Sequence, residues 1–406
     1  MGTLLGMSSL RSSALALLCG LSVTSCQLAG RNALGEVALK LGVPSKGPAF
    51  ELALYQTVGV ELTGGNDVEW NNNGAVFDAM VKEIGLAKAD VNIVTFIWAG
   101  GKASGRLLKA LADAHTRGVA CRVIIDSVGS LSFDDAPVRA AGCEVRRFRP
   151  VPGQDDLARN HRKILVVDGK VGFVGGFGID DKWLGSGQKE EEWRDSNVRV
   201  TGPVVRELQQ AFAENWQEVG GKLLPERCFP HAREKGGLRA ALVKSSGNAV
   251  VTTGDKLMQL LIASAQKRLW IANAYFVPSE PILELLEIKA KQGVDVRVLS
   301  AGEKTDTRVY LPDQRARVAR LLKIGVRAFE YEPTMMHAKT VLVDEELYAV
   351  GSLNLDALSL NKMEEDMVVA LDRDTAKELA ADFLDDLKRS LEVKLPKDPN
   401  QRVSMR

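Results

Sequence analysis

The sequence has little of what several classes of protein depend on. It holds five cysteines and four histidines in 406 residues, and no cysteine stands in a CxxC or Cys/His spacing of a zinc site. The net charge is +1, from 53 basic and 52 acidic residues, so the positive excess of a protein that coats nucleic acid is absent. Beyond the first 26 residues, no apolar run reaches the ~18 residues of a membrane-spanning helix.

The composition that remains is that of an ordered globular chain. Hydrophobic residues make up 45% and charged residues 26%, which excludes disorder over most of the length. At ~150 residues per domain, the length suggests two to three domains. Cys121 and Cys143 lie in apolar, strand-like runs, and we interpret them as buried structural thiols.

The first 26 residues resemble a targeting segment. Arg11 precedes an apolar stretch at 14–23, which is too short to span a bilayer but has the length of a signal-peptide core. The sequence VTSC, ending at Cys26, resembles a bacterial lipobox, in which the cysteine is lipidated. We therefore predict a membrane-associated lipoprotein of the bacterial cell envelope, facing the periplasm or the outer membrane. Plain secretion or an uncleaved anchor is the alternative, and a cytosolic protein is the least favoured.

Hydrophobic patterning predicts the same order of helices and strands twice. Alternating helical periods and short apolar runs favour an α/β fold with a mostly buried sheet. The recurrence over so long a distance indicates a duplicated domain and not a solenoid. We expect helices near 76–84, 105–117, 257–266 and 282–292, and strands at 91–98, 122–126 and 269–277.

One motif occurs once in each half, at an interval that matches the offset of the repeat. The stretch 160–169 reads NHRKILVVDG and the stretch 336–344 reads MHAKTVLVD, so both match HxKxxxxD and together hold half of all histidines. The apolar runs predict strands, whose period of two directs each histidine and its lysine to one face. The closing aspartates would face the opposite side, which suggests a structural or network role for them. The residues concerned are His161, Lys163 and Asp168 in the first box and His337, Lys339 and Asp344 in the second.

Two imidazoles and two ammonium groups around one anion-sized space suit a phosphodiester. The lysines would neutralise the non-bridging oxygens. One neutral histidine can attack phosphorus and form a covalent intermediate, while the other, protonated, gives its proton to the leaving oxygen. We therefore predict a single shared site with no metal and no other cofactor.

These boxes and several further stretches resemble the phospholipase D superfamily over roughly residues 55 to 390. The flanking sequence is closest to bacterial cardiolipin synthases and their relatives. The further matches are RVIIDSVGS (122–130), the glycine pair at 175–176, EWRD (192–195), NAYFVP (273–278) and GSLNLD (351–356).

The resemblance implies a fold and a domain plan. The fold would be two tandem phospholipase D-type α-β-α sandwich domains, related by pseudo-twofold symmetry, with the active site at their interface. We expect a signal peptide with a lipobox at 1–26, the first domain at 27–235, the second at 236–395 and a disordered tail at 396–406.

The resemblance also implies roles for individual side chains. His161 would be the nucleophile and His337 the general acid, with the two lysines holding phosphate. Carboxylates of the family match Glu365, expected near His161, and Asp195, expected near His337; a carboxylate that accepts the Nδ1 proton leaves the other nitrogen free to react. A surface position is the alternative for Glu365. Ser352 and Asn354 would donate hydrogen bonds to phosphate.

Three positions depart from the family pattern. Gly178 and Met363 stand where the family commonly has asparagine, and Leu358 stands where it often has arginine. Each departure removes a polar side chain near the expected site. Since both boxes are intact, we expect catalysis to survive, with the choice of substrate the property most open to change.

The leading hypothesis is a phosphatidyltransferase of the cardiolipin synthase type. Its partner would be membrane phospholipid, with phosphatidylglycerol favoured, and a lipid anchor would hold it at the membrane surface. A phospholipase D-type hydrolase is the first alternative, and a nuclease of the same chemistry is disfavoured by the near-zero net charge. A non-catalytic lipid-binding lipoprotein is the other alternative. The sequence indicates no particular oligomeric state.

Overall fold

The structure is a computed structural model that describes residues 43–150, 157–231, 236–247 and 251–395. The leader with its lipobox Cys26 and the tail at 396–406 lie outside the described residues.

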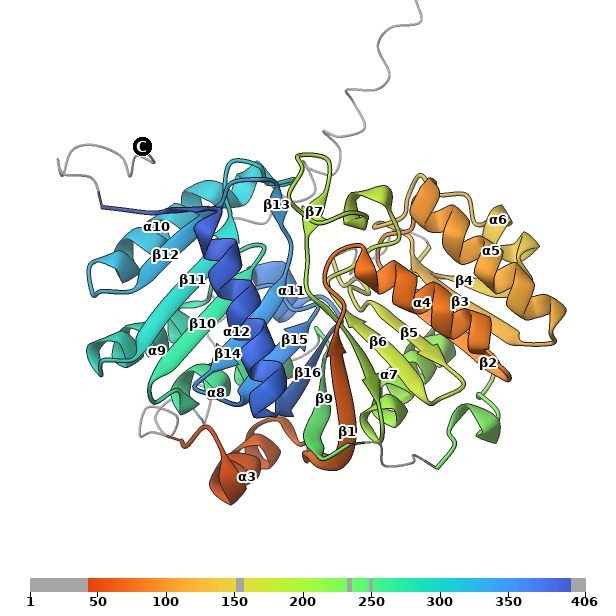
Figure 1. The fold of residues 1–406 in the computed structure, drawn as a ribbon, viewed down its shortest axis with the longest axis horizontal. Coiled ribbons are helices and arrows are strands. Elements are labelled where there is room, and N and C mark those ends of the chain that lie inside the picture. Colours follow the sequence, from red (N-terminus) through yellow and green to blue (C-terminus); the bar gives the residue numbers. More distant parts are fainter. Residues whose placement is uncertain (1–42, 151–156, 232–235, 248–250, 396–406) are drawn as a thin grey trace, which may run out of the picture.

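A single sheet of 15 strands runs through the described part of the chain, and its strand order repeats about the centre (Figure 1). On one side of the centre the order is β1-β8-β6-β5-β2-β3-β4, and on the other it is β9-β16-β15-β14-β10-β11-β12-β17. Every strand of the first series therefore has a counterpart in the second, and β17 is an added edge strand. The antiparallel contact between β1 and β9 joins the two repeats into one sheet.

The elements of the first repeat follow the predicted alternation. They are α3 (Gly47–Val58), β1 (Thr63–Trp70), α4 (Ala75–Leu86), β2 (Asp90–Thr95), α5 (Lys102–Thr116), β3 (Ala120–Asp126), α6 (Ala136–Ala140), β4 (Cys143–Phe148), β5 (Ile164–Val167), β6 (Val171–Gly175), η1 (Asp181–Trp183), β7 (Trp193–Arg194), β8 (Asn197–Thr201), α7 (Val204–Glu218) and η2 (Glu226–Cys228).

The second repeat has the same order of strands in the main sheet. Its elements are β9 (Leu238–Ser245), α8 (Thr253–Ser264), β10 (Arg268–Asn273), α9 (Glu280–Lys291), β11 (Asp295–Ala301), η3 (Arg308–Tyr310), α10 (Leu311–Leu322), β12 (Arg327–Tyr331), β13 (Met335–Met336), β14 (Lys339–Val343), β15 (Leu347–Gly351), α11 (Ala357–Asn361), β16 (Glu365–Leu371), α12 (Arg373–Lys388) and β17 (Ser390–Glu392).

Helices cover both faces of the sheet, with α12 and α4 on the front face in Figure 1 and α8 behind it. Strands such as β2 are buried along their whole length, as expected for near-continuous apolar runs between two helical layers. The predicted α/β sandwich built from two repeated halves is therefore confirmed. Helix α3, which precedes β1, packs on α8 of the second repeat through Phe50 and Leu54.

Two predicted strands are too long at their carboxyl ends. The runs at 91–98 and 269–277 leave the sheet after Thr95 and Asn273. Beyond these points the backbone turns away: Trp98 forms a bridge with Ile179. The apolar run continues past each strand because residues there are still buried outside the sheet, as Trp98 and Phe276 are in the hydrophobic cores.

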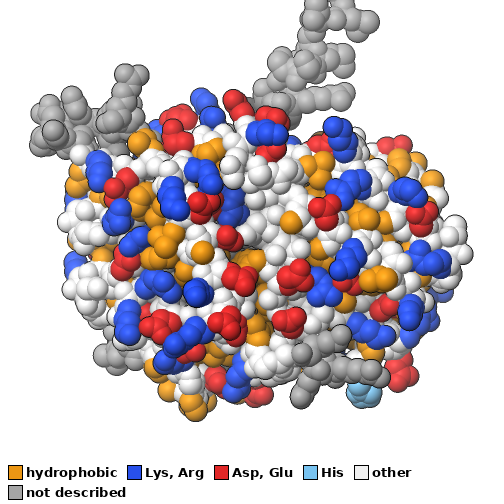
Figure 2. Space-filling view, in the orientation of Figure 1, with side chains coloured by type: hydrophobic (Ala, Val, Ile, Leu, Met, Phe, Trp, Pro, Cys, Tyr) orange, Lys and Arg blue, Asp and Glu red, His pale blue; other side chains and the backbone are white. Residues whose placement is uncertain are grey.

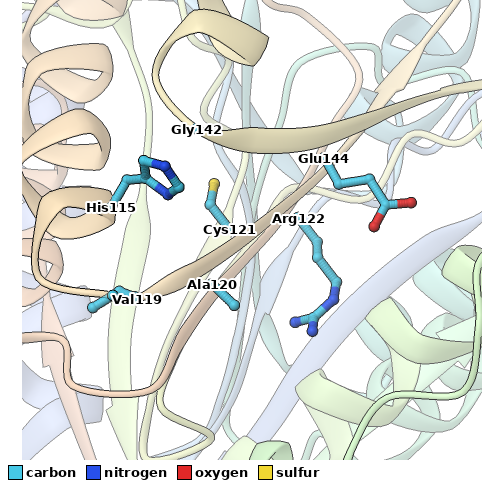
Figure 3. A pocket seen from close by; sticks show the side chains of 8 residues that line it. His115, Val119, Ala120, Cys121, Arg122, Gly142 and Glu144 are labelled. Carbon is cyan, nitrogen blue, oxygen red and sulfur yellow. The ribbon is translucent and has the colours of Figure 1, made fainter.

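The interpretation of Cys121 and Cys143 as free thiols is wrong. They are buried, as predicted, but form a disulfide across the neighbouring parallel strands β3 and β4, with Cα atoms 4.4 Å apart. Hydrophobic pattern alone does not give the register that places them opposite each other. Figure 3 shows the Cys121 sulfur near the His115 ring in a pocket of about 290 Å³, whose other polar lining residues are Arg122 and Glu144.

Candidate active site

The backbone amide of each box histidine forms a hydrogen bond to a backbone carbonyl of the other repeat. The amide of His161 donates to the carbonyl of Glu364 at 2.9 Å, and the amide of His337 donates to the carbonyl of Arg194 at 2.7 Å. Short bridges flank both contacts: Asn160 pairs with Glu364, and β13 pairs with β7. These pairings lie outside the regular strands β5 and β14, so the two histidines are not strand residues as predicted. The first residues of each box instead pair through their backbone with the other repeat.

Each histidine takes its carboxylate from the other repeat. His161 Nδ1 lies 3.0 Å from both oxygens of Glu365, and His337 Nδ1 lies 2.8 Å from Oδ2 of Asp195. These are the two pairings expected from the resemblance, and Glu365 is 0% exposed, so it is not a surface residue. Burial alone would raise the pKa of both carboxyl groups, but the facing histidine and the nearby lysine hold each pKa below its ordinary value.

The two lysines of the boxes are buried, and they lie close enough for the charge of one to affect the pKa of the other. Each Nζ donates to the backbone carbonyl of the histidine in its own box. Burial brings the pKa of Lys163 to about 7 and that of Lys339 to about 8, and the charge of Lys339 contributes to the shift at Lys163. An anion placed between them would stabilise the charged form of both lysines, and an ammonium group has further N–H donors to offer it.

The imidazoles belong to one electrostatic site. Burial lowers the pKa of His337 to about 3 and also lowers the pKa of His161. Lys339 adds to the lowering of the pKa of His161, and Lys163 adds to the lowering of the pKa of His337. Because each histidine responds to the lysine of the other repeat, the four side chains lie close enough to act on one another. Both rings are neutral at neutral pH before a substrate binds.

Further side chains hold the two carboxylates. Glu365 accepts hydrogen bonds from the hydroxyls of Ser352 and Ser359, whereas Asp195 accepts from the indole of Trp183. Asn354 is buried beside this network, and its side-chain oxygen has no partner within the described part of the chain. The hydroxyl of Ser352 therefore donates to Glu365, although the resemblance implied a hydrogen bond to phosphate. The side-chain oxygen of Asn354 is an acceptor that the described residues do not use.

The closing aspartates of the boxes do not join this cluster. The carboxylate of Asp168 accepts from the backbone amides of residues 88–90, at 2.7 to 3.2 Å. The carboxylate of Asp344 accepts from the amides of residues 266–268 and from the hydroxyl of Ser45. Both aspartates lie in the left-handed backbone region, with φ of 53° and 52°, at the turn after their strand. Each one therefore ties that turn to the start of a neighbouring strand.

The three departures from the family pattern have different surroundings. Gly178 lies against the ring of Trp183, so the space of a side chain at this position is taken by an indole. Leu358 and Met363 are partly exposed, on and just after α11. Among the described residues, no group of three or more histidines, cysteines or carboxylates is arranged to hold a metal ion.

Sequence reasoning missed the aromatic walls of the site. The Phe96 ring meets His161 edge-on at 4.9 Å, and two indoles, those of Trp183 and Trp193, lie 5.3 and 5.0 Å from His337. Trp183 follows His161 at the same interval along the chain as Ser359 follows His337, but this spacing alone does not indicate an aromatic side chain at the site.

Comparisons with known proteins agree over most of the chain. The family model described as "Cardiolipin synthase, PLD-like domain" matches residues 80–216 and 258–387. The cardiolipin synthase of Geobacillus sp. (strain WCH70) is 34% identical over 331 residues, which are 79% of this chain and 65% of that protein. Cardiolipin synthase A of Pseudomonas fluorescens (strain SBW25) is 35% identical over 329 residues, which are 79% of this chain and 68% of that protein. The chain thus spans about two thirds of the length of these relatives.

Solved structures share the fold at low sequence identity. The phosphatidylserine synthase of Haemophilus influenzae Rd KW20 superposes with a TM-score of 0.63 and 13% identity, covering 85% of this chain and 92% of that one. The polyphosphate kinase of Porphyromonas gingivalis superposes with a TM-score of 0.53 and 11% identity, covering 81% of this chain and 48% of that one.

Proposed function

The chain belongs to the cardiolipin synthase family of phospholipase D-like proteins, and from that premise we propose that it is a phosphatidyltransferase that acts through a phosphohistidine. The observation that carries the proposal is the reciprocal pairing of His161 with Glu365 and of His337 with Asp195, with one lysine behind each imidazole. The substrate we propose is phosphatidylglycerol, as both donor and acceptor.

In the first step, His161 attacks the phosphorus of the donor. Glu365 holds the Nδ1 proton, so the lone pair of Nε2 is free to form the N–P bond. As that bond forms, the bond from phosphorus to the headgroup oxygen breaks, and its electron pair stays on the oxygen. His337 gives that oxygen a proton, and glycerol leaves. Lys163 and Lys339 hold the non-bridging oxygens while charge builds on them.

In the second step, the roles reverse. His337, now neutral, takes the proton from a hydroxyl group of a second phosphatidylglycerol. That oxygen attacks phosphorus, the N–P bond breaks with its electrons returning to Nε2, and cardiolipin is released. The sum of the two steps is two phosphatidylglycerols giving one cardiolipin and one glycerol.

In the substrate-free site His337 is neutral at neutral pH, so its use as a general acid depends on a rise of its pKa when the substrate binds. Its pKa of about 3 reflects burial first and then the charge of Lys339. A bound phosphodiester brings one negative charge between the lysines, which offsets their effect and raises the proton affinity of the imidazole. Substrate binding would therefore load the general acid with its proton.

A lipid is favoured over a nucleic acid as the substrate. The face of the molecule in Figure 2 carries lysine, arginine and acidic side chains interspersed, with no continuous basic track of the kind that follows a phosphate backbone. The net charge of +1 agrees with this.

We also propose a place in the bacterial cell envelope, at a membrane surface. The Cys121–Cys143 disulfide fits an oxidising compartment such as the periplasm. The lipobox at Cys26 fits an anchor there. No helix within the described ranges combines the length and the apolar character needed to cross a bilayer.

The test uses the protein with vesicles of phosphatidylglycerol, with products separated by chromatography. Cardiolipin with free glycerol is the expected result. Phosphatidic acid alone would instead establish the hydrolase, and the absence of any lipid product would overturn the proposal. His161→Ala and His337→Ala should each abolish turnover. His115→Ala is the matched control, because His115 lies in the pocket of Figure 3, and it should keep full activity. Activity should also survive EDTA.

A further inference from the structure

The two orienting carboxylates are held in unequal ways, although they occupy matching places in the repeats. Glu365 accepts from two serine hydroxyls, one on each oxygen, and both of these oxygens also face Nδ1 of His161. Asp195 accepts from the indole N–H of Trp183 at 2.7 Å and from the backbone amide of Ser196 at 2.8 Å. The oxygen of Asp195 that binds Trp183 is Oδ2, which also faces Nδ1 of His337 at 2.8 Å. One carboxylate oxygen is therefore shared between an indole and an imidazole.

Trp183 and Ser359 occupy the same position of the repeat. Each follows the histidine of its own box at the same interval along the chain. Each lies on a short helix, η1 or α11, whose first amides are capped by an aspartate, Asp180 in one repeat and Asp356 in the other. The two helices therefore present their residue to the carboxylate in the same way. The chemical difference between the repeats lies in the side chain presented.

The indole fits because the first repeat has a glycine where the second has an asparagine. A Cβ atom at Gly178 would lie 2.7 Å from the six-membered ring of Trp183. The counterpart of Gly178 in the second repeat, counted from the histidine of each box, is Asn354. The departure from the family pattern at position 178 is thus the space that Trp183 fills.

Trp183 also walls off the imidazole of His337. Its ring meets that of His337 edge-on at 5.3 Å and packs 4.7 Å from the ring of Trp193, which is itself 5.0 Å from His337. Trp183 is 0% exposed. The imidazole of His161 has a single aromatic neighbour among the described residues, Phe96.

We propose that Trp183 is a positioning residue that makes His337 a weaker base than it would be without the indole, by donating to the Asp195 oxygen that faces it and by excluding water from the imidazole. A donated hydrogen bond draws charge from Oδ2, so the carboxylate stabilises a neighbouring imidazolium less. The packed rings remove the solvation that a charged imidazole needs. The proposal rests on the proposed function only for the use made of His337 as a general acid, since a weaker base is a stronger acid.

The other charged groups that face His337 are the same in the wild type and in a variant at position 183. Lys339 on β14 and Lys163 in the first box both lower the pKa of His337, and Asp195 after β7 raises it. A change at Trp183 therefore acts through the indole hydrogen bond and the burial of the ring.

The experiment titrates the four histidines of the full chain by NMR, with His337 assigned from the spectrum of H337Q. Trp183→Phe keeps an aromatic ring and removes the donor. We expect the pKa of His337 to rise by about one pH unit, as for the loss of a hydrogen bond to a charged group, while that of His161 stays unchanged. An unchanged pKa of His337 overturns the proposal. The titration needs no substrate, so it remains decisive even if the chain proves inactive on lipid.

Trp98→Phe is the matched control. Trp98 is an equally buried indole of the same repeat, which donates to the Ser104 hydroxyl at 2.9 Å and stacks on Phe133. The pKa of His337 should keep its wild-type value in this variant. If Trp183→Phe does not fold, Gly178→Ala serves instead, because its added Cβ displaces the indole; it too should raise the pKa of His337, and no shift would count against the proposal.

A kinetic readout separates positioning from simple structural loss. With phosphatidylglycerol, Trp183→Phe should lower kcat about tenfold while KM changes less than about twofold, and the alkaline limb of kcat should move to higher pH. A smaller active fraction with the limb in its wild-type place would show a structural role only, and the proposal would be abandoned.

Discussion

The lysines of the two boxes have pKa values close to neutrality in the substrate-free site. Burial brings them down from an ordinary 10.5 to about 7 at Lys163 and about 8 at Lys339. A phosphate anion between them stabilises the charged forms and so raises both values again. Binding of the substrate and retention of two protons are therefore linked.

We expect KM for phosphatidylglycerol to rise as the pH is raised from about 6 to about 9. The lysines are protonated below their pKa and hold the anion; above it they are neutral, and the free site loses the charge that attracts phosphate. Initial rates over a series of lipid concentrations at each pH give the measurement. A KM that falls over this range would contradict the assigned role of the lysines.

Lys163→Arg tests the same point, since a guanidinium stays charged throughout this range. Its KM should depend less on pH than that of the wild type. Its kcat should be lower, because a planar fork does not reproduce the point charge of an ammonium group.

At the scale of helices and strands, the hydrophobic pattern predicted the presence of a strand better than the residue at which the strand ends. The predicted strands at 91–98 and 269–277 correspond to β2 and β10, but both end several residues early. The residues that follow stay apolar because they pack outside the sheet, Trp98 and Phe276 in the hydrophobic cores and Phe96 against His161. A continuous apolar run indicates burial, but the sequence does not distinguish burial within the sheet from burial beside it.

The aspartates that close the boxes act at this scale too, because each joins two elements. Asp168 holds the amides of residues 88–90 at the start of β2 from the turn that follows β5. Asp168→Ala leaves these amides without an acceptor, and we expect a loss of about 2–4 kcal/mol in the free energy of unfolding. Urea denaturation followed by circular dichroism measures it.

Asp168→Asn is the milder control, because one oxygen remains as an acceptor, and it should lose less stability. In both variants kcat per folded molecule should stay within about threefold of the wild type. A loss of several orders of magnitude in kcat, with stability intact, would instead place Asp168 among the catalytic residues.

On the scale of the whole molecule, the repeat in the sequence was enough to predict a shared site between two halves. The identities of both carboxylates followed from the resemblance. The disulfide and the role of Trp183 did not, because each depends on register and on which side chain fills a gap. Those are properties of packing, and neither composition nor spacing reports them.

A buried ion pair across the halves belongs to this scale. Arg194, beside the site, donates to both oxygens of Asp386 on α12, at 3.0 and 2.9 Å. Asp386→Ala leaves a buried guanidinium without its partner, so we expect a loss of about 3–5 kcal/mol in the free energy of unfolding. It should lower kcat as well, since the Arg194 carbonyl holds the amide of His337.

The exposed pair between Arg373 and Glu345 provides the comparison, with side chains 65% and 52% exposed. Arg373→Ala should cost less than about 1 kcal/mol. Equal losses in the two variants would mean that the buried pair does not help to hold the halves together.

The exchange of carboxylates between repeats bears on how such a chain arose. A single ancestral copy could complete its histidine only in a symmetric dimer, where both centres were forced to be identical. Once the copies were fused in one gene, each could change alone. The first repeat now has an aspartate bound by an indole, and the second has a glutamate bound by a hydroxyl. Gene fusion, on this view, is what allowed an acid and a nucleophile to diverge from one inherited residue.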